Sequence, residues 1–421
     1  MEKYNSQLQG TICIVDAYST GKKLLHEFSK YGKKCIHIKS TEKEEDDHKR
    51  TEFIAELTYT GNLFSLKDEL KKFNPEFIIA GSEMGVELAD KLSEVFNIQK
   101  CNNPLSTALR RNKYFMHEKL KEANLKAIKQ FKSKNVLEIM NWAEVNKKWP
   151  VVVKPLNSAA SDGVTICGNT NEIEQAFSRI MYQENKLGIK NEEVLIQEYV
   201  EGTQYFVNTI SWNGKHYISD IWKQNRRRLK DRAFLFESMS LCDSEGELEK
   251  ELIEYTKKIL DALELSHGAA HNEIIITKDG PVLIELNARL MGASIEDEAF
   301  KQALDMTQAE ILALAYSNHD LFLQNYADKK YLKKQHLHEV SFIYEKNGIL
   351  LDFPKKYSIE RMFSFFCFSG LNQIGNAVKK TEDTLGHPGY VYLVHHEEEI
   401  ISKDTEQILK WQRNNELFII E

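Results

Sequence analysis

Residues 271–289 read HNEIIITKDGPVLIELNAR, two apolar runs rich in β-branched side chains on either side of the pair Asp279-Gly280. An Asp-Gly pair between such runs is a strong signal for a two-residue hairpin turn. If the chain folds back at this turn, Glu273 and Glu285 come to lie close across the two strands. The stretch therefore predicts an antiparallel hairpin that brings two carboxylates together.

The same hairpin gathers further polar side chains on one face. Side chains at positions i and i+2 of a strand point the same way, so Asn287 lies beside Glu285 and Arg289 continues the face. Three oxygen ligands on adjacent strands suit Mg²⁺, which takes its remaining ligands from water and phosphate oxygens. The alternative is a set of ordinary surface positions, but the apolar run indicates an interior strand, where unpaired carboxylates are costly. We expect a magnesium triphosphate site.

A lysine ends a second buried strand. Residues 151–155 read VVVKP, and the loop 156–163, LNSAASDG, is rich in small residues before a strand resumes at Val164. Backbone N–H groups and hydroxyls of such a loop can surround a phosphate, and Lys154 supplies the matching positive charge. Taken alone, a lysine at a strand end more often extends to solvent.

A third stretch, VLIQEYVEG at residues 194–202, is a strand that runs into an acidic turn and a glycine. Backbone groups of such a hinge can pair with an adenine edge, and its acidic side chains can reach ribose hydroxyls. A strand followed by a plain turn explains this stretch equally well when it is considered alone.

Taken together along the chain, the three stretches resemble the ATP-grasp superfamily over about residues 102–293. The resemblance implies an ATP-grasp fold, with ATP and Mg²⁺ (or Mn²⁺) as cofactors. It assigns nucleotide binding to Lys113, Lys154, Ser158, Ser161, Gly163, Glu198, Tyr199, Val200 and Glu201, metal binding to Glu273, Glu285 and Asn287, and catalysis to Lys154 and Arg289, with Arg289 also contacting the substrate.

Two positions depart from the pattern of that superfamily. The loop over the phosphates has one glycine, Gly163, where many relatives have several, so we expect phosphate contacts from Ser158 and Ser161. Gln204 stands where relatives often have a glutamate, which puts a charged contact from that position in doubt.

The chain is long enough for several domains, and its class is α/β and α+β. Alternating strands and helices predict an N-terminal parallel α/β domain at residues 1–101. The ATP-grasp domain is expected at 102–325, with a helical lead-in (102–150), a nucleotide-binding lid (151–205) and a catalytic core (206–325). Residues 326–421 are expected to form a strand-rich C-terminal subdomain.

A looser resemblance concerns the substrates. YFVNTISWNGKHYISDIWKQNRR (205–227) and GHPGYVYLVH (386–395) are similar to the L-amino acid ligases, which make dipeptides. This similarity implies a peptide bond formed between L-amino acids through an aminoacyl phosphate, with release of ADP and phosphate. Asp220 and Trp222 then become candidate substrate residues, with Asp220 on an ammonium group, and Arg226, Arg227 and Arg228 either hold a carboxylate or form a solvated turn. His267 and His271 are expected to be structural.

Bulk properties exclude some partners. The formal net charge of −7 gives no general attraction to nucleic acid or to anionic lipid. The six cysteines are widely spaced, which favours free thiols in a reducing compartment, and no run approaches the length of a membrane span. We expect a cytoplasmic enzyme that acts on small molecules and does not bind membranes, and the sequence leaves its oligomeric state open, a homodimer included.

Two other readings remain open. One is a carboxylase or a nucleotide-precursor ligase of the same superfamily, although the chain has no Met-Lys biotin carrier motif. The other is a nucleotide-binding regulator without turnover. The intact set of Lys154, Glu273, Glu285, Asn287 and Arg289 speaks against it, because a degenerate site would be free to lose charges that are costly to bury together.

Overall fold

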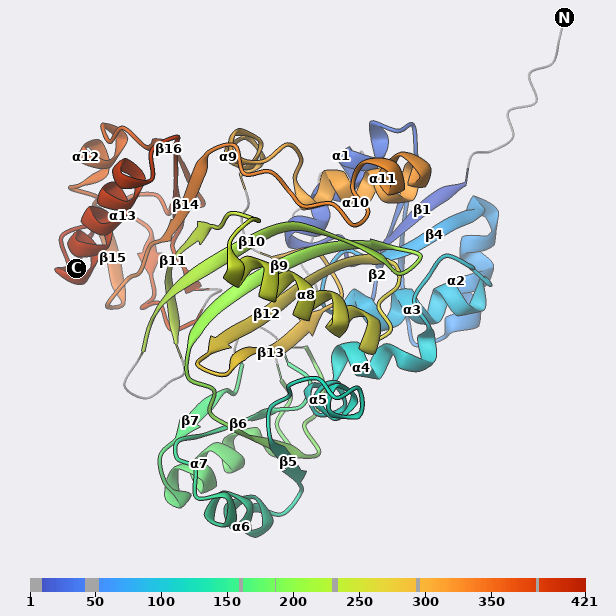
Figure 1. Ribbon diagram of the computed structural model, residues 1–421, viewed down its shortest axis with the longest axis horizontal. Helices are drawn as coiled ribbons and strands as arrows, with labels where there is room; N and C mark the ends of the chain where they lie inside the picture. The colour runs from blue at the N-terminus through green and yellow to red at the C-terminus, as the bar shows by residue number, and fades with distance from the viewer. Residues whose placement is uncertain are drawn as a thin grey trace, which may run out of the picture.

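The computed structural model describes residues 10–41, 53–158, 162–185, 187–228, 234–292, 296–383 and 386–421. The described chain forms an N-terminal parallel sheet, a small antiparallel sheet and a large central sheet, with a three-stranded sheet near the C-terminus (Figure 1). No helix among these residues has the length and apolar content that crossing a membrane requires.

The N-terminal sheet is wholly parallel, in the order β3-β2-β1-β4, which confirms the predicted α/β fold of this region. The chain leaves β1 to one side for β2 and later returns to the other side for β4. Ligands of open parallel sheets bind at such a switch point, beyond the carboxyl ends of the strands. Its elements are β1 (Thr11–Val15), η1 (Ser19–Lys22), α1 (Lys23–Ser29), β2 (Cys35–Lys39), β3 (Ala55–Thr58), α2 (Leu63–Leu70), η2 (Lys71–Phe73), β4 (Pro75–Ala80) and α3 (Gly85–Val95).

The loops that follow β1 and β4 touch each other at two glycines. A Cβ atom on Gly21 would lie 2.2 Å from the carbonyl oxygen of Gly81. No side chain fits there, so glycine at this position permits the close approach of the two loops.

The second sheet, with order β5-β8-β6-β7, is antiparallel and has a core of its own, which includes Val153 and Phe177 (Figure 1, bottom). Two helices, α6 and α7, pack on it. A short 3-10 helix and two helices lead into this lid. These elements are η3 (Pro104–Ser106), α4 (Thr107–Arg111), α5 (Lys113–Glu122), β5 (Gln130–Ser133), α6 (Val136–Asn146), β6 (Val151–Pro155), β7 (Thr165–Cys167), α7 (Thr170–Ile180) and β8 (Val194–Glu198).

The central sheet has the order β13-β12-β9-β10-β11-β14-β18-β16, and each of its neighbouring pairs is antiparallel. Asn213-Gly214 joins β9 to β10. The predicted hairpin of β12 and β13 is confirmed, with Lys278-Asp279 as the connection and Gly280 as the first residue of β13. Its strands are β9 (Thr203–Trp212), β10 (Lys215–Arg227), β11 (Leu235–Leu241), β12 (Gly268–Thr277), β13 (Gly280–Asn287), β14 (His336–Ser341), β16 (Phe365–Ser369) and β18 (Tyr390–His395).

Helix α8 (Glu247–Ala262) packs on this sheet. Its buried Leu252, Ile253, Ile259 and Leu260 have the spacing of an amphipathic helix. Three helices follow the hairpin, α9 (Asp297–Ala303), α10 (Gln308–Ser317) and α11 (His319–Asn325), and α10 packs against α1.

The C-terminal segment adds β14, β16 and β18 to the central sheet. These strands extend the sheet that β9 to β13 begin (Figure 1). Its other elements are β15 (Gly348–Asp352), α12 (Lys356–Glu360), β17 (Ala377–Val378), α13 (Glu398–Arg413) and β19 (Ile419–Ile420).

Candidate active site

A cavity of about 540 Å³ lies where the N-terminal sheet, the lid and the central sheet meet. Loops after β1 and β4 form one wall, β6 and β8 of the lid form another, and strands β9 to β14 form the floor. The described chain therefore brings together residues from position 18 to position 390 around one space.

Charged side chains of opposite sign converge in this cavity. Lys113, at the first position of α5, lies 2.8 Å from Glu285 Oε2 and donates a hydrogen bond of 2.9 Å to the Ser158 carbonyl oxygen. Lys154, at the end of β6, is buried, and this burial together with Lys113 lowers its pKa to about 8, against the opposing influence of Glu285 and Glu273. Burial alone would raise the pKa of Glu285, but Lys113 and Lys154 outweigh burial and lower it. Glu285 is therefore ionised.

The predicted metal ligands lie together on the β12–β13 hairpin. Glu273 and Glu285 are direct partners in the strand register, and Asn287 hydrogen bonds to Glu285. Gln204 of β9 donates a hydrogen bond of 2.8 Å to Glu273 Oε2 and accepts one from Arg226 of β10. The neutral Gln204 thus links Glu273 to an arginine instead of adding a carboxylate.

Arg289 lines the cavity and meets a carboxylate that the sequence analysis did not find. Its Nε atom lies 3.2 Å from Glu83 Oε2, and its NH1 group donates to the Leu290 carbonyl oxygen at 2.8 Å. Glu83 follows β4 and also pairs with Arg111 at the end of α4. The signal that could have found Glu83 is its place after a buried parallel strand, next to the switch point of the sheet.

The loop over the cavity is held by short-range contacts. Ser158 lines the cavity and donates a hydrogen bond of 2.8 Å to Asp162 Oδ2. Gly163 has φ of +67°, and a Cβ atom there would lie 3.0 Å from Pro155, so glycine suits this turn. Gly163 is not among the described residues that line the cavity. Ser161 lies outside the described residues.

Three of the four predicted hinge residues line the cavity, namely Glu198, Tyr199 and Val200. The Glu198 Oε1 atom accepts a hydrogen bond of 3.1 Å from the Lys129 backbone nitrogen. Glu201 is exposed and is not among the described residues that line the cavity.

The structure does not bring Asp220 and Trp222 to the cavity. They belong to the same series of every second residue along β10 as Gln224 and Arg226, which do line it. Phe300 of α9 packs on the Trp222 ring at 5.1 Å, and the Asp220 carboxylate accepts hydrogen bonds from Asn208, Ser219 and Trp222. The predicted ammonium site at Asp220 is thus filled by the protein's own donors, because this part of the strand is covered.

His271, expected to be structural, lies in the cavity wall instead. Its Nδ1 atom is 2.8 Å from Asn208 Oδ1 and its Nε2 atom is 3.8 Å from Glu273 Oε1. Asp220 binds the other end of Asn208, so the buried chain Asp220–Asn208–His271 orients the imidazole beside Glu273.

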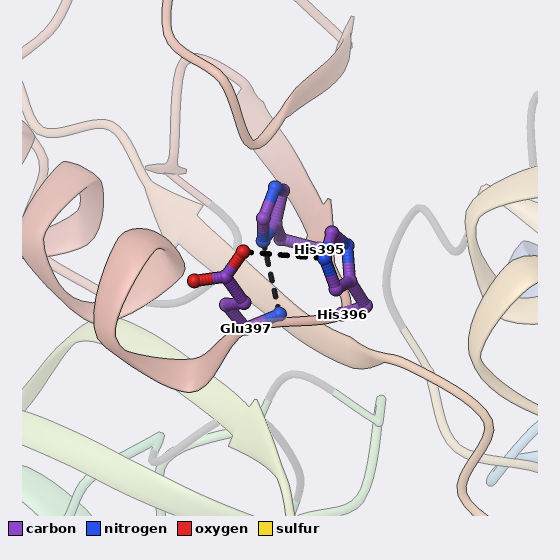
Figure 2. Close-up of side chains that lie close together, drawn as sticks. All are labelled: His395, His396 and Glu397. Carbon is purple, nitrogen blue, oxygen red and sulfur yellow. Dashed lines mark hydrogen bonds and ion pairs between the residues drawn. The ribbon is translucent and has the colours of Figure 1, made fainter.

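Another group of ligand-type side chains lies away from the cavity (Figure 2). His395, His396 and Glu397 have ligand atoms within 4.8 Å of one another at the end of β18. His396 pairs with Glu397 at 3.2 Å, and the Glu397 backbone nitrogen donates to His395 Nδ1 at 3.0 Å. Two of the three side chains are exposed, and internal contacts account for their proximity.

Fold and site together define a class of protein. The ATP-grasp domain family matches residues 147–298, from just before β6 to the start of α9. Residues 147–298 of the chain are therefore an ATP-grasp domain.

Comparison with particular proteins narrows the class. The chain is 29% identical over 404 residues to dapdiamide A synthase from Enterobacter agglomerans, across 91% of each chain. It is 23% identical over 250 residues to a phosphoribosylamine–glycine ligase from Methanocaldococcus jannaschii, covering 54% of this chain and 56% of that one. The crystal structure of an L-amino acid ligase from Bacillus licheniformis matches 99% of this chain and 100% of that one, with a TM-score of 0.78 and 14% identity. The chain thus shares its overall fold with this L-amino acid ligase.

Proposed function

We propose that this protein is an ADP-forming carboxylate–amine ligase that joins two L-amino acids through an acyl phosphate. The observation that carries the proposal is the convergence of Lys113, Lys154 and Arg289 on the paired Glu273 and Glu285 within one cavity. Such an arrangement serves a reaction in which negative charge moves between phosphate and carboxylate oxygens.

The relatives support amino acids as substrates. The similarity to dapdiamide A synthase runs along nearly the whole chain, and the fold of the whole chain is that of an L-amino acid ligase. A cavity of about 540 Å³ is also roomy enough for more than a nucleotide's phosphates, because typical small-molecule sites measure roughly 300–1,000 Å³.

The residues present fit a nucleotide with a divalent cation. Glu273, Glu285 and Asn287 offer oxygen atoms from adjacent strands, the donor type that Mg²⁺ or Mn²⁺ prefers. The cation would neutralise phosphate charge during phosphoryl transfer. Backbone groups of Tyr199 and Val200, which line the cavity, would receive the adenine edge.

The chain's own residues then have distinct tasks. Lys113 and Lys154 hold phosphate oxygens by charge, and Arg289 offers its guanidinium to the carboxylate that accepts the γ-phosphoryl group. The amine nitrogen of the second substrate next forms a bond to the acyl carbon, and phosphate leaves with the electrons of the broken C–O bond. Arg289 stabilises the oxyanion of that step. The lid excludes water, which would otherwise hydrolyse the acyl phosphate.

The test is a screen of amino-acid pairs with ATP and Mg²⁺, scored by release of ADP and phosphate and by mass spectrometry of the product. We expect an amide whose formation needs the divalent cation and both amino acids. Release of AMP and pyrophosphate would contradict the acyl-phosphate route. Turnover with bicarbonate or a phosphorylated amine in place of an amino acid would move the protein to the carboxylase or nucleotide-precursor branch.

A further inference from the structure

The C-terminal segment supplies one end of the cavity wall. Glu339 and Ser341 of β14 line the cavity together with Tyr390 of β18. In the strand register Glu339 faces Tyr392, and Ser341 faces Tyr390. Because alternate residues share a face, this strand pair presents a carboxyl and two hydroxyl groups to the same space.

Glu339 is the unusual member of this group. Its exposed fraction is 5%, and its Oε2 atom accepts a hydrogen bond of 2.8 Å from the Tyr392 hydroxyl. Across the described chain it forms no ion pair with lysine, arginine or histidine. A buried carboxylate without a cation is costly, and burial raises the pKa of Glu339 to about 7, with Tyr392 opposing the rise.

Among the described residues of the strands beside Glu339, none of those paired with it or with its neighbours is positively charged. Tyr390 and Tyr392 come from β18, Cys367 from β16 faces Tyr392 in the register, and Ser238 and Met239 come from β11. The carboxylate of Glu296, just before α9, is held by a 2.6 Å hydrogen bond from Ser369 and adds negative charge near Tyr392. This end of the cavity is therefore acidic.

The cationic side chains line other parts of the cavity. Lys113 of α5, Lys154 of β6 and Arg289 after β13 lie on the side of the lid and of β13, the far edge of the central sheet from β14, and Arg226 lies on β10, with β11 between it and β14. A nucleotide and an activated carboxylate are anionic, so they belong with these cations. The amine-donating substrate carries an ammonium group in solution, and the complementary charge for it lies at Glu339.

We propose that Glu339 is the ammonium subsite for the second, amine-donating substrate and accepts a proton from that ammonium. This inference rests on the proposed ligase activity. The transfer converts R–NH₃⁺ and the Glu339 carboxylate into R–NH₂ and the neutral Glu339 carboxyl group, and it leaves the amine with the lone pair that attacks the acyl carbon. A carboxyl group in a dry, acidic wall suits both tasks, since it attracts a cation and can also hold a proton.

The test uses Glu339→Gln in the full chain and separates two half-reactions. With ATP, the first amino acid and hydroxylamine, a nucleophile that is neutral at mildly alkaline pH, the variant should form acyl hydroxamate at the wild-type rate. With the second amino acid as nucleophile, its KM should rise about 10- to 100-fold, the effect expected for one lost charge-assisted hydrogen bond. In the variant, the acidic limb of the pH dependence of kcat/KM for the amine should be flatter than in the wild type.

Two further variants complete the design. Glu339→Asp keeps the charge and should retain more of the amine affinity than Glu339→Gln. It also provides a second test of the subsite if the glutamine variant folds poorly. Glu360→Gln, on the exposed end of α12, is the matched control and should behave as wild type.

The outcomes are distinct. An unchanged amine KM and pH profile in Glu339→Gln would overturn the subsite, and so would an equal loss of hydroxamate and amide formation. Wild-type protein that forms no hydroxamate with any carboxylate would instead refute the ligase activity itself.

Discussion

Glu285 and Glu339 are both largely buried glutamates in the wall of one cavity, yet their surroundings shift their pKa values in opposite directions. Glu285 has Lys113 at 2.8 Å and Lys154 nearby, and its pKa falls below the usual value. Among the described residues Glu339 has a tyrosine hydroxyl as its hydrogen-bond partner and no ion pair, and its pKa rises to about 7. Both carboxyl groups are largely buried, so the presence or absence of neighbouring lysines sets the direction in which the pKa of each one shifts.

The contrast also divides the cavity by task. Lys113 and Lys154 place positive charge beside Glu285, which suits the phosphate oxygens and the metal ion proposed for this end. Beside Glu339, the ammonium group of the proposed second substrate would supply the positive charge. A reaction that first activates a carboxylate and then admits an amine needs both environments close to each other but distinct.

The largest expected effect comes from removing the paired charge. Glu285→Gln should lower kcat for amide formation by about 10³-fold or more, because a metal ligand is lost and two buried lysines lose their partner. Steady-state kinetics with saturating ATP and Mg²⁺ measures it, with Glu360→Gln as control. A near-normal kcat would show that the metal site lies elsewhere.

Arg289→Met tests whether Arg289 acts on the reacting groups or on nucleotide binding. The substitution keeps the apolar stem and removes the guanidinium, so the rate should fall about 10²- to 10³-fold, as for loss of one transition-state donor. Nucleotide affinity, measured by calorimetry, should change little because the hinge and Lys154 are untouched. If ATP binding collapses while the rate at saturating ATP survives, Arg289 is a nucleotide anchor.

The stability of the protein should depend on pH with opposite sign at the two glutamates. The unfolded-state pKa of both is near 4.5. Glu339 has a raised folded pKa, so its contribution to stability is fully present below about pH 4.5 and falls by up to about 3 kcal/mol as the pH rises through about 7. Glu285 has a lowered folded pKa, so its contribution is present above about pH 4.5 and is lost as the pH falls through the folded pKa.

Denaturation midpoints measured across pH check this prediction. Relative to wild type, Glu339→Gln should gain stability as the pH rises from 5 to 8. Relative to wild type, Glu285→Gln should be most destabilised near neutral pH and should approach wild-type stability in acid. Parallel curves for both variants would contradict the contrast between the two sites.

The smallest effect is expected at Tyr392. Tyr392→Phe removes the hydrogen bond to Glu339, which should cost about 1 kcal/mol of stability and raise the pKa of Glu339 further. The acidic limb of the pH profile for the amine should move to higher pH. An unmoved limb would mean that another group titrates in that profile.

The sequence alone predicted the hairpin and the convergence of Glu273, Glu285 and Asn287, but the direct pairing of Glu273 with Glu285 depends on a register shift between Glu273 and Ile274 that the sequence pattern does not show. Turn chemistry at Asp279-Gly280 and strand alternation are local properties, so they can be read within twenty residues of chain. The same local reasoning gave Lys154 at the end of its strand.

Only the tertiary structure decided which distant side chains join this hairpin and which parts of a strand are covered. Alternation places Asp220, Trp222, Gln224 and Arg226 in one series, but Phe300 of α9 packs on Trp222 and neighbouring side chains hydrogen bond to Asp220, whereas Gln224 and Arg226 line the cavity. Glu83 arrives from the parallel sheet and Glu339 from a strand more than fifty residues beyond the hairpin. Their roles depend on long-range packing and on which charges lie within a few ångströms, and no periodicity in the sequence encodes either.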